Sequence, residues 1–139
     1  MFFRYFRPRS DICDLVSSYY EITLPIDLTD IMRAEIANVR FVLSGEVGSD
    51  LQGEDAKFPE GSSVLCGPTY RWSHISFKEG TRVFGAAVTP LGWCRLFGIE
   101  ANTLSDQSVS LADFVPAEAR AAIARVHEAG SDDALVAAA

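Results

Sequence analysis

The chain has 139 residues, of which 48% are hydrophobic and 11% aromatic, and this composition indicates one folded domain and excludes a disordered or collagen-like chain. A domain of this length buries roughly two-thirds of its unfolded surface, so it needs no disulfide or metal ion to fold. Twelve Lys and Arg against 19 Asp and Glu give a net charge of −7, which disfavours direct binding to a nucleic-acid backbone.

The cysteines and the hydrophobic runs indicate a cellular compartment. Cys13, Cys66 and Cys94 are odd in number and lack CxxC spacing, so they predict neither a disulfide framework nor a zinc site. The first nine residues hold no apolar stretch of signal-peptide length, and the longest uncharged run, residues 83–94, is too short to cross a bilayer. We therefore expect a soluble, cytoplasmic protein with no membrane partner.

The first predicted element is a short helix. Ser10 suits an N-cap, and the apolar residues after it have helical spacing, namely Ile12, Leu15, Val16 and Tyr19. Residues 20–24 then favour a strand that Pro25 ends.

The middle of the chain predicts short strands separated by turn residues. We expect strands over residues 37–43, 63–66, 70–77 and 81–88. The polar, acidic residues 48–61 are typical of an exposed connection. Several short strands at this spacing favour an antiparallel sandwich or small barrel.

The pattern changes to helical after residue 88. Thr89 suits an N-cap, Pro90 suits the first helical position, and Gly98 can adopt the left-handed conformation that ends a helix. Residues 110–115 form a brief apolar element. The sequence thus divides into a β-rich part, residues 1–115, and a helical part, residues 116–139.

The strongest predicted helix covers residues 116–129, and another helix begins after Ser131. The apolar stripe of the first helix has two interpretations: it packs on the sheet of its own chain, or it meets a second copy. The second interpretation makes a homodimer interface of Ala119, Ile123 and Val126. The last helix has no capped end, so we expect the natural protein to continue beyond residue 139.

Candidate catalytic groups are sparse, and we predict no catalytic residue, no metal site and no cofactor. His74 stands alone in the predicted sheet and His127 lies on a helix, so neither belongs to a metal-ligand motif. Cys94 lies near a helix start, but a small buried hydrophobe is the better interpretation. The acidic cluster of Asp50, Glu54 and Asp55 is typical of a solvated loop.

Aromatic side chains are the candidates for a ligand pocket. A small barrel can hold one small molecule among the residues Phe41, Tyr70, Trp72, His74 and Trp93. The alternative is that these residues fill the core. Trp72 has the strongest claim to a binding role, because the other face of its strand is already apolar.

Several segments resemble the sensor domains of AraC-type transcriptional regulators. They read, in chain order, RPRSDICDLVSSYYEI, VRFVLSGEV, VLCGPTYRW and TRVFGAAVTPLGWCRLFGIEANTLSDQSVSLADFV. The resemblance covers nearly the whole chain, and the last segment, residues 81–115, is its most specific part.

The resemblance implies a cupin-like β-barrel with C-terminal helices that senses a small-molecule effector or mediates dimerisation. It also implies two helix-turn-helix units beyond residue 139 as the only part that binds DNA. The function expected is therefore that of a non-catalytic sensor or dimerisation domain of a bacterial regulator. The alternative is a small, metal-free cupin-like enzyme, an isomerase or epimerase of a small polar substrate, in which His74 would pair with Tyr70 or a carboxylate.

Overall fold

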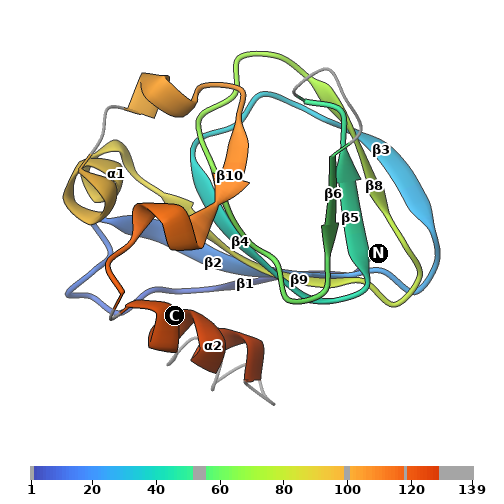
Figure 1. Cartoon of the computed structure of the whole chain (residues 1–139), viewed down its shortest axis with the longest axis horizontal. Helices are drawn as coiled ribbons and strands as arrows, with labels where there is room; N and C mark the ends of the chain where they lie inside the picture. The colour runs from blue at the N-terminus through green and yellow to red at the C-terminus, as the bar shows by residue number, and fades with distance from the viewer. Residues whose placement is uncertain (1, 52–55, 99–100, 118, 129–139) are drawn as a thin grey trace.

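Two antiparallel sheets face each other, and short helices cover the outer side of the larger one (Figure 1). This computed structural model describes residues 2–51, 56–98, 101–117 and 119–128. Glu54, Asp55, residue 129 of the predicted long helix and the predicted helix after Ser131 lie outside the described residues. The mainly β architecture with C-terminal helices confirms the predicted fold class.

The larger sheet has six strands and the smaller has four, and all their pairings are antiparallel. The order in the larger sheet is β1 (Phe2–Phe6), β2 (Val16–Thr23), β9 (Arg82–Val88), β4 (Asn38–Ser44), β7 (Ser63–Cys66) and β10 (Ser108–Ser110). The order in the smaller sheet is β3 (Leu28–Met32), β8 (Ser73–Phe77), β5 (Glu46–Ser49) and β6 (Ala56–Pro59).

The helical elements follow the predicted punctuation. They are α1 (Pro90–Phe97), the 3-10 turns η1 (Ala101–Leu104) and η2 (Leu111–Phe114), and α2 (Ala119–Glu128). The Thr89 hydroxyl accepts a hydrogen bond from the Gly92 N–H at 3.0 Å, and Gly98 ends α1 with a φ of 66°. A Cβ on Gly92 would lie 2.0 Å from the Leu15 carbonyl oxygen, so glycine lets α1 pack directly on the turn before β2.

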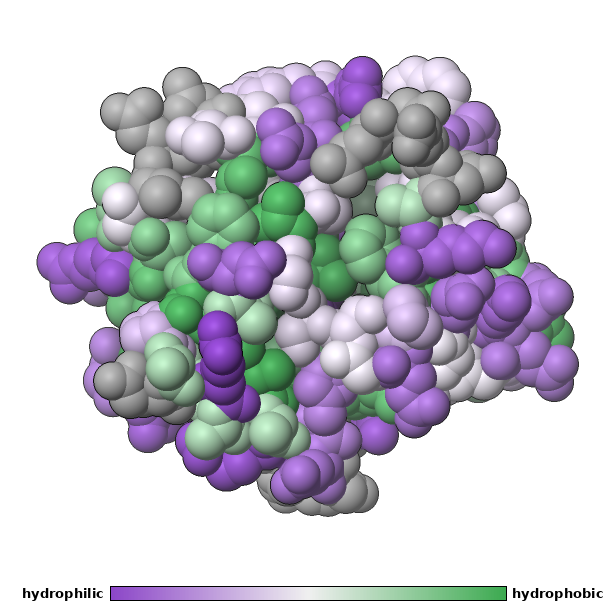
Figure 2. All heavy atoms as spheres, in the orientation of Figure 1, coloured by the Kyte–Doolittle hydropathy of each residue, from purple (hydrophilic) through white to green (hydrophobic). Residues whose placement is uncertain are grey.

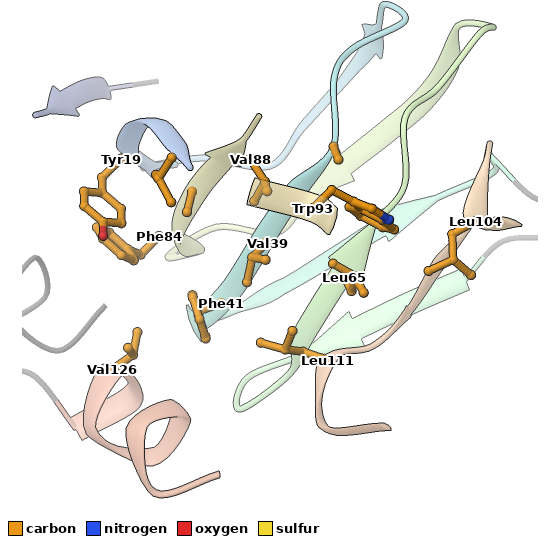
Figure 3. Packing of buried hydrophobic residues seen from close by; sticks show 13 residues of the cluster. Tyr19, Val39, Phe41, Leu65, Phe84, Val88, Trp93, Leu104, Leu111 and Val126 are labelled. Carbon is orange, nitrogen blue, oxygen red and sulfur yellow. The ribbon is translucent and has the colours of Figure 1, made fainter. Parts of the chain in front are cut away.

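The central strands of the six-stranded sheet are buried on both faces, and each face belongs to a separate hydrophobic core, whereas the edge strand β1 is mostly exposed. Figure 3 shows the core on the helical side, where Phe84, Leu65 and Trp93 pack with Val126 of α2. The second core lies between the two sheets and contains Tyr20, Ile22, Leu24, Ile75, Phe77 and Val83. Alternate residues of β4 and β9 therefore point into different cores.

Two sequence predictions about secondary structure are wrong. Residues 10–15 form turns and Val16 already begins β2, because Val16 and Tyr19, two of the residues that suggested a helix, pair with β9 as part of a strand. Residues 48–61 are more than a connection, since they include all of β6 and residues 48–49 of its partner β5. These strands carry few apolar residues, so backbone pairing holds them and their hydrophobic pattern is weak. The strands β1 and β3 were not predicted either.

The helix α2 belongs to the same core as the sheet. Val126 is 2% exposed and Ile123 is partly buried, and both pack in the cluster that contains Phe41. A hydrogen bond of 2.8 Å also joins His127 Nε2 and Ser63 Oγ. No helix in the described part of the chain has the length and hydropathy that a membrane crossing requires.

Candidate functional site

A cavity of about 50 Å³ lies between the two sheets. Both sheets contribute apolar side chains to its wall, among them Ile22, Val42, Val47, Val64, Phe77 and Val83. A cavity of this size exceeds the volume needed for one water molecule, and an apolar wall with a few polar groups is typical of a small-molecule site.

The polar lining residues gather at one end of the cavity. They come from the C-terminal ends of β3, β5 and β7, the N-terminal ends of β4, β8 and β10, and the loops beside them: Arg33, Glu35, Arg40, Ser49, Cys66, Thr69, Ser73 and Ser108. The opposite end is apolar. A bound molecule would therefore place its polar group toward this end and its hydrocarbon part away from it.

Arg40 is the charged group at the centre of this polar end. Its Nε donates to the Tyr20 hydroxyl at 2.9 Å, and its Nη2 pairs with Glu35 Oε1. The Tyr20 hydroxyl donates in turn to Asn38 Oδ1 at 2.9 Å. Arg40 points inward because its neighbours Val39 and Phe41 occupy the opposite face of β4.

The network keeps Arg40 charged although it is largely buried. Burial disfavours the cation, but Tyr20, Cys66 and Glu35 together raise the pKa of Arg40 well above its ordinary value. Burial also raises the pKa of Tyr20, against the opposing effect of Arg40. At neutral pH the site therefore holds a cationic guanidinium beside a neutral phenol.

A free thiol completes the polar end. Cys66 is buried, and its Sγ lies 3.8 Å from Arg40 Nη1 and 3.6 Å from Ser108 Oγ. Sulfur is a weak acceptor, so this side of the guanidinium is less well satisfied than the sides that meet oxygen.

Two loops are joined at the cavity entrance. The Glu35 N–H donates to Thr69 Oγ1 at 2.7 Å, and the Thr69 N–H donates to the Glu35 carbonyl oxygen at 2.9 Å. These bonds hold the backbone at Glu35 while leaving its side chain 29% exposed. The entrance also carries Arg33, and Arg71 donates to the carbonyl oxygen of Leu51, another lining residue.

None of the five predicted ligand-binding residues lines this cavity. Phe41 and Trp93 are 6% and 1% exposed and belong to the core on the helical side. Tyr70 and Trp72 are exposed in the loop before β8, and His74 faces outward from the smaller sheet. The predicted division of this strand into two faces is right, but the inward face is that of Ile75 and Phe77.

Most of the predicted dimer residues pack against the core of their own chain. Val126 and Ile123 pack on the chain's own core, and Ala119 is partly exposed. Since Val126 is 2% exposed, it offers almost no surface to a second copy. A homodimer remains a prediction, and its interface has to involve other residues of the surface.

His74 has a carboxylate partner that the sequence did not reveal. Its ring Nδ1 lies 2.8 Å from Asp50 Oδ2, and its backbone N–H donates to Asp50 Oδ1 at 2.7 Å. These hydrogen bonds lower the pKa of Asp50. The Trp72 ring meets His74 edge-on, with centroids 5.2 Å apart, and a surface hollow of about 240 Å³ beside the pair contains Lys57 and Ser76.

The surface differs between the two sides of the molecule. Figure 2 shows hydrophobic residues gathered over α1 and β10 and hydrophilic residues over the smaller sheet. Leu91 and Leu96 of α1 are each about half exposed, at 46% and 48%. Within the residues described, no group of three or more His, Cys, Asp or Glu side chains is arranged to hold a metal ion.

Sequence reasoning missed the Arg40 network for a specific reason. Asn38, Arg40 and Val42 alternate with Val39, Phe41 and Leu43, and only the second set was interpreted as a buried face. An arginine in such a strand is typical of a solvent-exposed face. The signal that could have identified it is the apolar neighbour Val42 on the same face, which indicates a strand buried on both sides.

No protein-family model matches the chain, and no curated protein matches it. Solved structures that are similar to it include a cupin-2 domain protein from Shewanella frigidimarina, with 11% identity, a TM-score of 0.42 and coverage of 52% of this chain and 70% of that one. A predicted oxalate decarboxylase from Thermotoga maritima has 12% identity and a TM-score of 0.49, and the match covers 62% and 77% of the two chains.

A third similar structure is the cupin domain of an XRE-family transcriptional regulator from Enterobacter cloacae. It has 14% identity and a TM-score of 0.47, and the match covers 63% of this chain and 93% of that domain. The three proteins thus include a regulator and an enzyme by description, and the regulator is of another class than the AraC type expected above. At such identities and TM-scores, no activity, ligand or partner carries over to this chain.

Proposed function

We propose that this chain is a non-catalytic domain that senses a small molecule for a bacterial transcriptional regulator. The cavity between the sheets carries this proposal, because it combines an apolar wall with one buried, hydrogen-bonded arginine. Pockets of this kind bind small molecules through hydrophobic burial and orient them through a few polar groups.

The arrangement of the two cores supports sensing. The strand β4 directs Arg40 into the cavity and Phe41 toward α2, where Val126 and His127 pack. A ligand between the sheets therefore acts on a wall that also holds the C-terminal helix. The AraC-type resemblance of residues 81–115 supports the regulatory part of the proposal, with DNA binding assigned to residues beyond this chain.

The test is a thermal-shift screen of small polar and amphipathic compounds. We expect at least one class of compound to raise the Tm of the wild-type chain and to be recovered chemically unchanged after long incubation. Val64→Leu fills part of the cavity and should reduce that shift. Val109→Leu is the matched control, because Val109 lies on the adjacent strand and packs in the other core. A screen without a response, or an equal response in both variants, would overturn the proposal.

One observation favours the second candidate, a metal-free isomerase or epimerase. Asp50 holds Nδ1 of His74 at 2.8 Å, which leaves Nε2 as the ring nitrogen able to exchange a proton with a molecule in the adjacent hollow. Small sugars and hydroxy acids incubated with the chain in D₂O would then gain deuterium, detectable by NMR. His74→Gln should abolish the exchange and His127→Gln should leave it intact.

A further inference from the structure

We propose that the cavity takes a short-chain monocarboxylate, which displaces the Glu35 carboxylate from Arg40. This inference rests on the proposed ligand-sensing function and names the chemical class of its ligand. The Glu35 carboxylate, at the entrance of the site, then competes with the ligand carboxylate for Arg40.

The first argument is the charge of the buried arginine. Arg40 is 18% exposed, and Glu35 is the acidic group that pairs with it among the described residues. A buried charge without a counter-charge is strongly destabilising. A molecule that takes the place of Glu35 must therefore bring its own negative charge, which favours a carboxylate over a neutral amide or alcohol of the same shape.

The second argument is the geometry of the guanidinium. Glu35 meets Arg40 through one oxygen on Nη2, while Nη1 has the Cys66 sulfur at 3.8 Å as its partner. A ligand carboxylate lying along the edge formed by Nη1 and Nη2 can accept two parallel hydrogen bonds. Paired contacts of this type are stronger than one contact to oxygen and a weak contact to sulfur.

The third argument is the ease with which Glu35 can leave. Its backbone is held by two hydrogen bonds to Thr69, but its side chain is 29% exposed at the entrance. The carboxylate can rotate into water, where it is well solvated, without breaking the contact between the loops. Exposed Arg33 at the same entrance favours the approach of an anion to a chain whose net charge is −7.

The size and lining of the cavity limit the rest of the ligand. Its volume of about 50 Å³ is well below the roughly 150 Å³ of an engineered cavity that holds benzene. The wall beyond Arg40 is formed by Val42, Val64 and Val83. Propionate fits this description, because it joins one carboxylate, which takes the place of the Glu35 carboxylate, to a hydrocarbon part of two carbons.

The test compares propionate with propionamide by calorimetry on the wild-type chain and on Glu35→Gln. We expect propionate to bind more tightly than propionamide. Removing the competing carboxylate should increase propionate affinity on the order of tenfold and should leave propionamide affinity nearly unchanged. Glu46→Gln is the matched control, since it removes one negative charge from an ion pair with Lys78 outside the cavity.

Arg40 is tested with two variants, because Arg40→Gln can disturb the fold around Tyr20. Arg40→Lys keeps the charge but loses the paired hydrogen bonds, so we expect propionate binding to weaken at least severalfold while the circular dichroism spectrum is unchanged. Retention of wild-type affinity in a folded Arg40→Lys would overturn the inference.

Other outcomes separate this inference from the proposed function. Equal binding of amide and acid, or no gain in Glu35→Gln, would overturn the carboxylate exchange. If a neutral compound still binds and Val64→Leu blocks it, the cavity remains a sensing site. If propionate and every other compound fail, both proposals are wrong.

Discussion

The contact between Tyr20 and Gly85 determines how the polar end of the cavity is built. Gly85 lies on β9 between Tyr20 of β2 and Arg40 of β4 in the strand register. A Cβ on Gly85 would lie 2.2 Å from Cζ of the Tyr20 ring. The missing side chain thus lets Tyr20 lie across β9 and place its hydroxyl on Arg40.

We predict that Gly85→Ala destabilises the protein by about 1–3 kcal/mol, because the ring must move and its hydrogen bonds to Arg40 and Asn38 are strained or lost. Urea denaturation measures this change. The control is a double-mutant cycle with Tyr20→Leu, in which the clash is absent. The losses in free energy of unfolding of the two single variants should therefore sum to more than the loss in the double variant. Strict additivity would contradict the role given to Gly85.

At the scale of secondary-structure elements, α2 is held on the sheet by a small number of side chains. Val126 is almost fully buried, and His127 packs edge-on against Phe41, with ring centroids 5.8 Å apart. Ile123 is partly buried in the same cluster, whereas Arg120, Arg125 and Glu128 are exposed. Its docking therefore depends on one turn near its C-terminal end.

We predict that Val126→Ala lowers the free energy of unfolding by about 1–2 kcal/mol, through lost burial and the space left behind. Leu96→Ala, at a position of α1 that is 48% exposed, should change it by less than about 0.5 kcal/mol. Urea denaturation compares the two, and light scattering checks the mass. An unchanged free energy of unfolding in Val126→Ala would contradict the docking of α2 through this residue.

The docking of α2 should depend on pH through His127. Burial lowers the pKa of His127 below its ordinary value of 6.5. The unfolded chain therefore binds a proton at His127 more readily than the folded chain does. The contribution of neutral His127 to stability is complete above pH 6.5 and is lost as the pH falls toward the lowered pKa of the folded state. We expect the Tm to fall over this range, and His127→Gln to reduce the fall. An identical pH profile in the variant would contradict this assignment.

At the scale of the whole molecule, the net charge of −7 determines how the chain meets other macromolecules. We predict that residues 1–139 alone do not shift a labelled DNA duplex at moderate salt, because the overall field repels phosphate. An electrophoretic mobility assay, repeated at low salt to reveal weak contacts, measures this. Tight binding to one sequence by this chain would contradict the prediction.

The sequence was informative where local chemistry decides the structure. The N-cap Thr89, the stop at Gly98 and the alternating strand around Phe41 all lie where they were predicted. The turn at residues 10–15 was mistaken for a helix, because long-range pairing of β2 with β9 decides that segment. The effector-sensing role and the regulator class remain proposals.

The candidate site was not predictable from the sequence in the same way. Tyr20, Glu35 and Arg40 come from two strands and a loop, and only the sheet register brings them together. The pair of His74 and Asp50 likewise depends on β5 and β8 being neighbours. Conspicuous aromatic residues were therefore chosen, while an inconspicuous arginine lies at the cavity.

The larger sheet separates two hydrophobic cores, and both faces of its central strands are buried. Almost any substitution on β4 or β9 therefore changes the volume of the side chains that fill one core or the other. We therefore expect the residues of these two strands to tolerate little substitution, because each of them fills space in a packed core. A molecule that widens the space between the sheets should also shift residues on the opposite face of the larger sheet, so we expect its binding to alter the packing of α2.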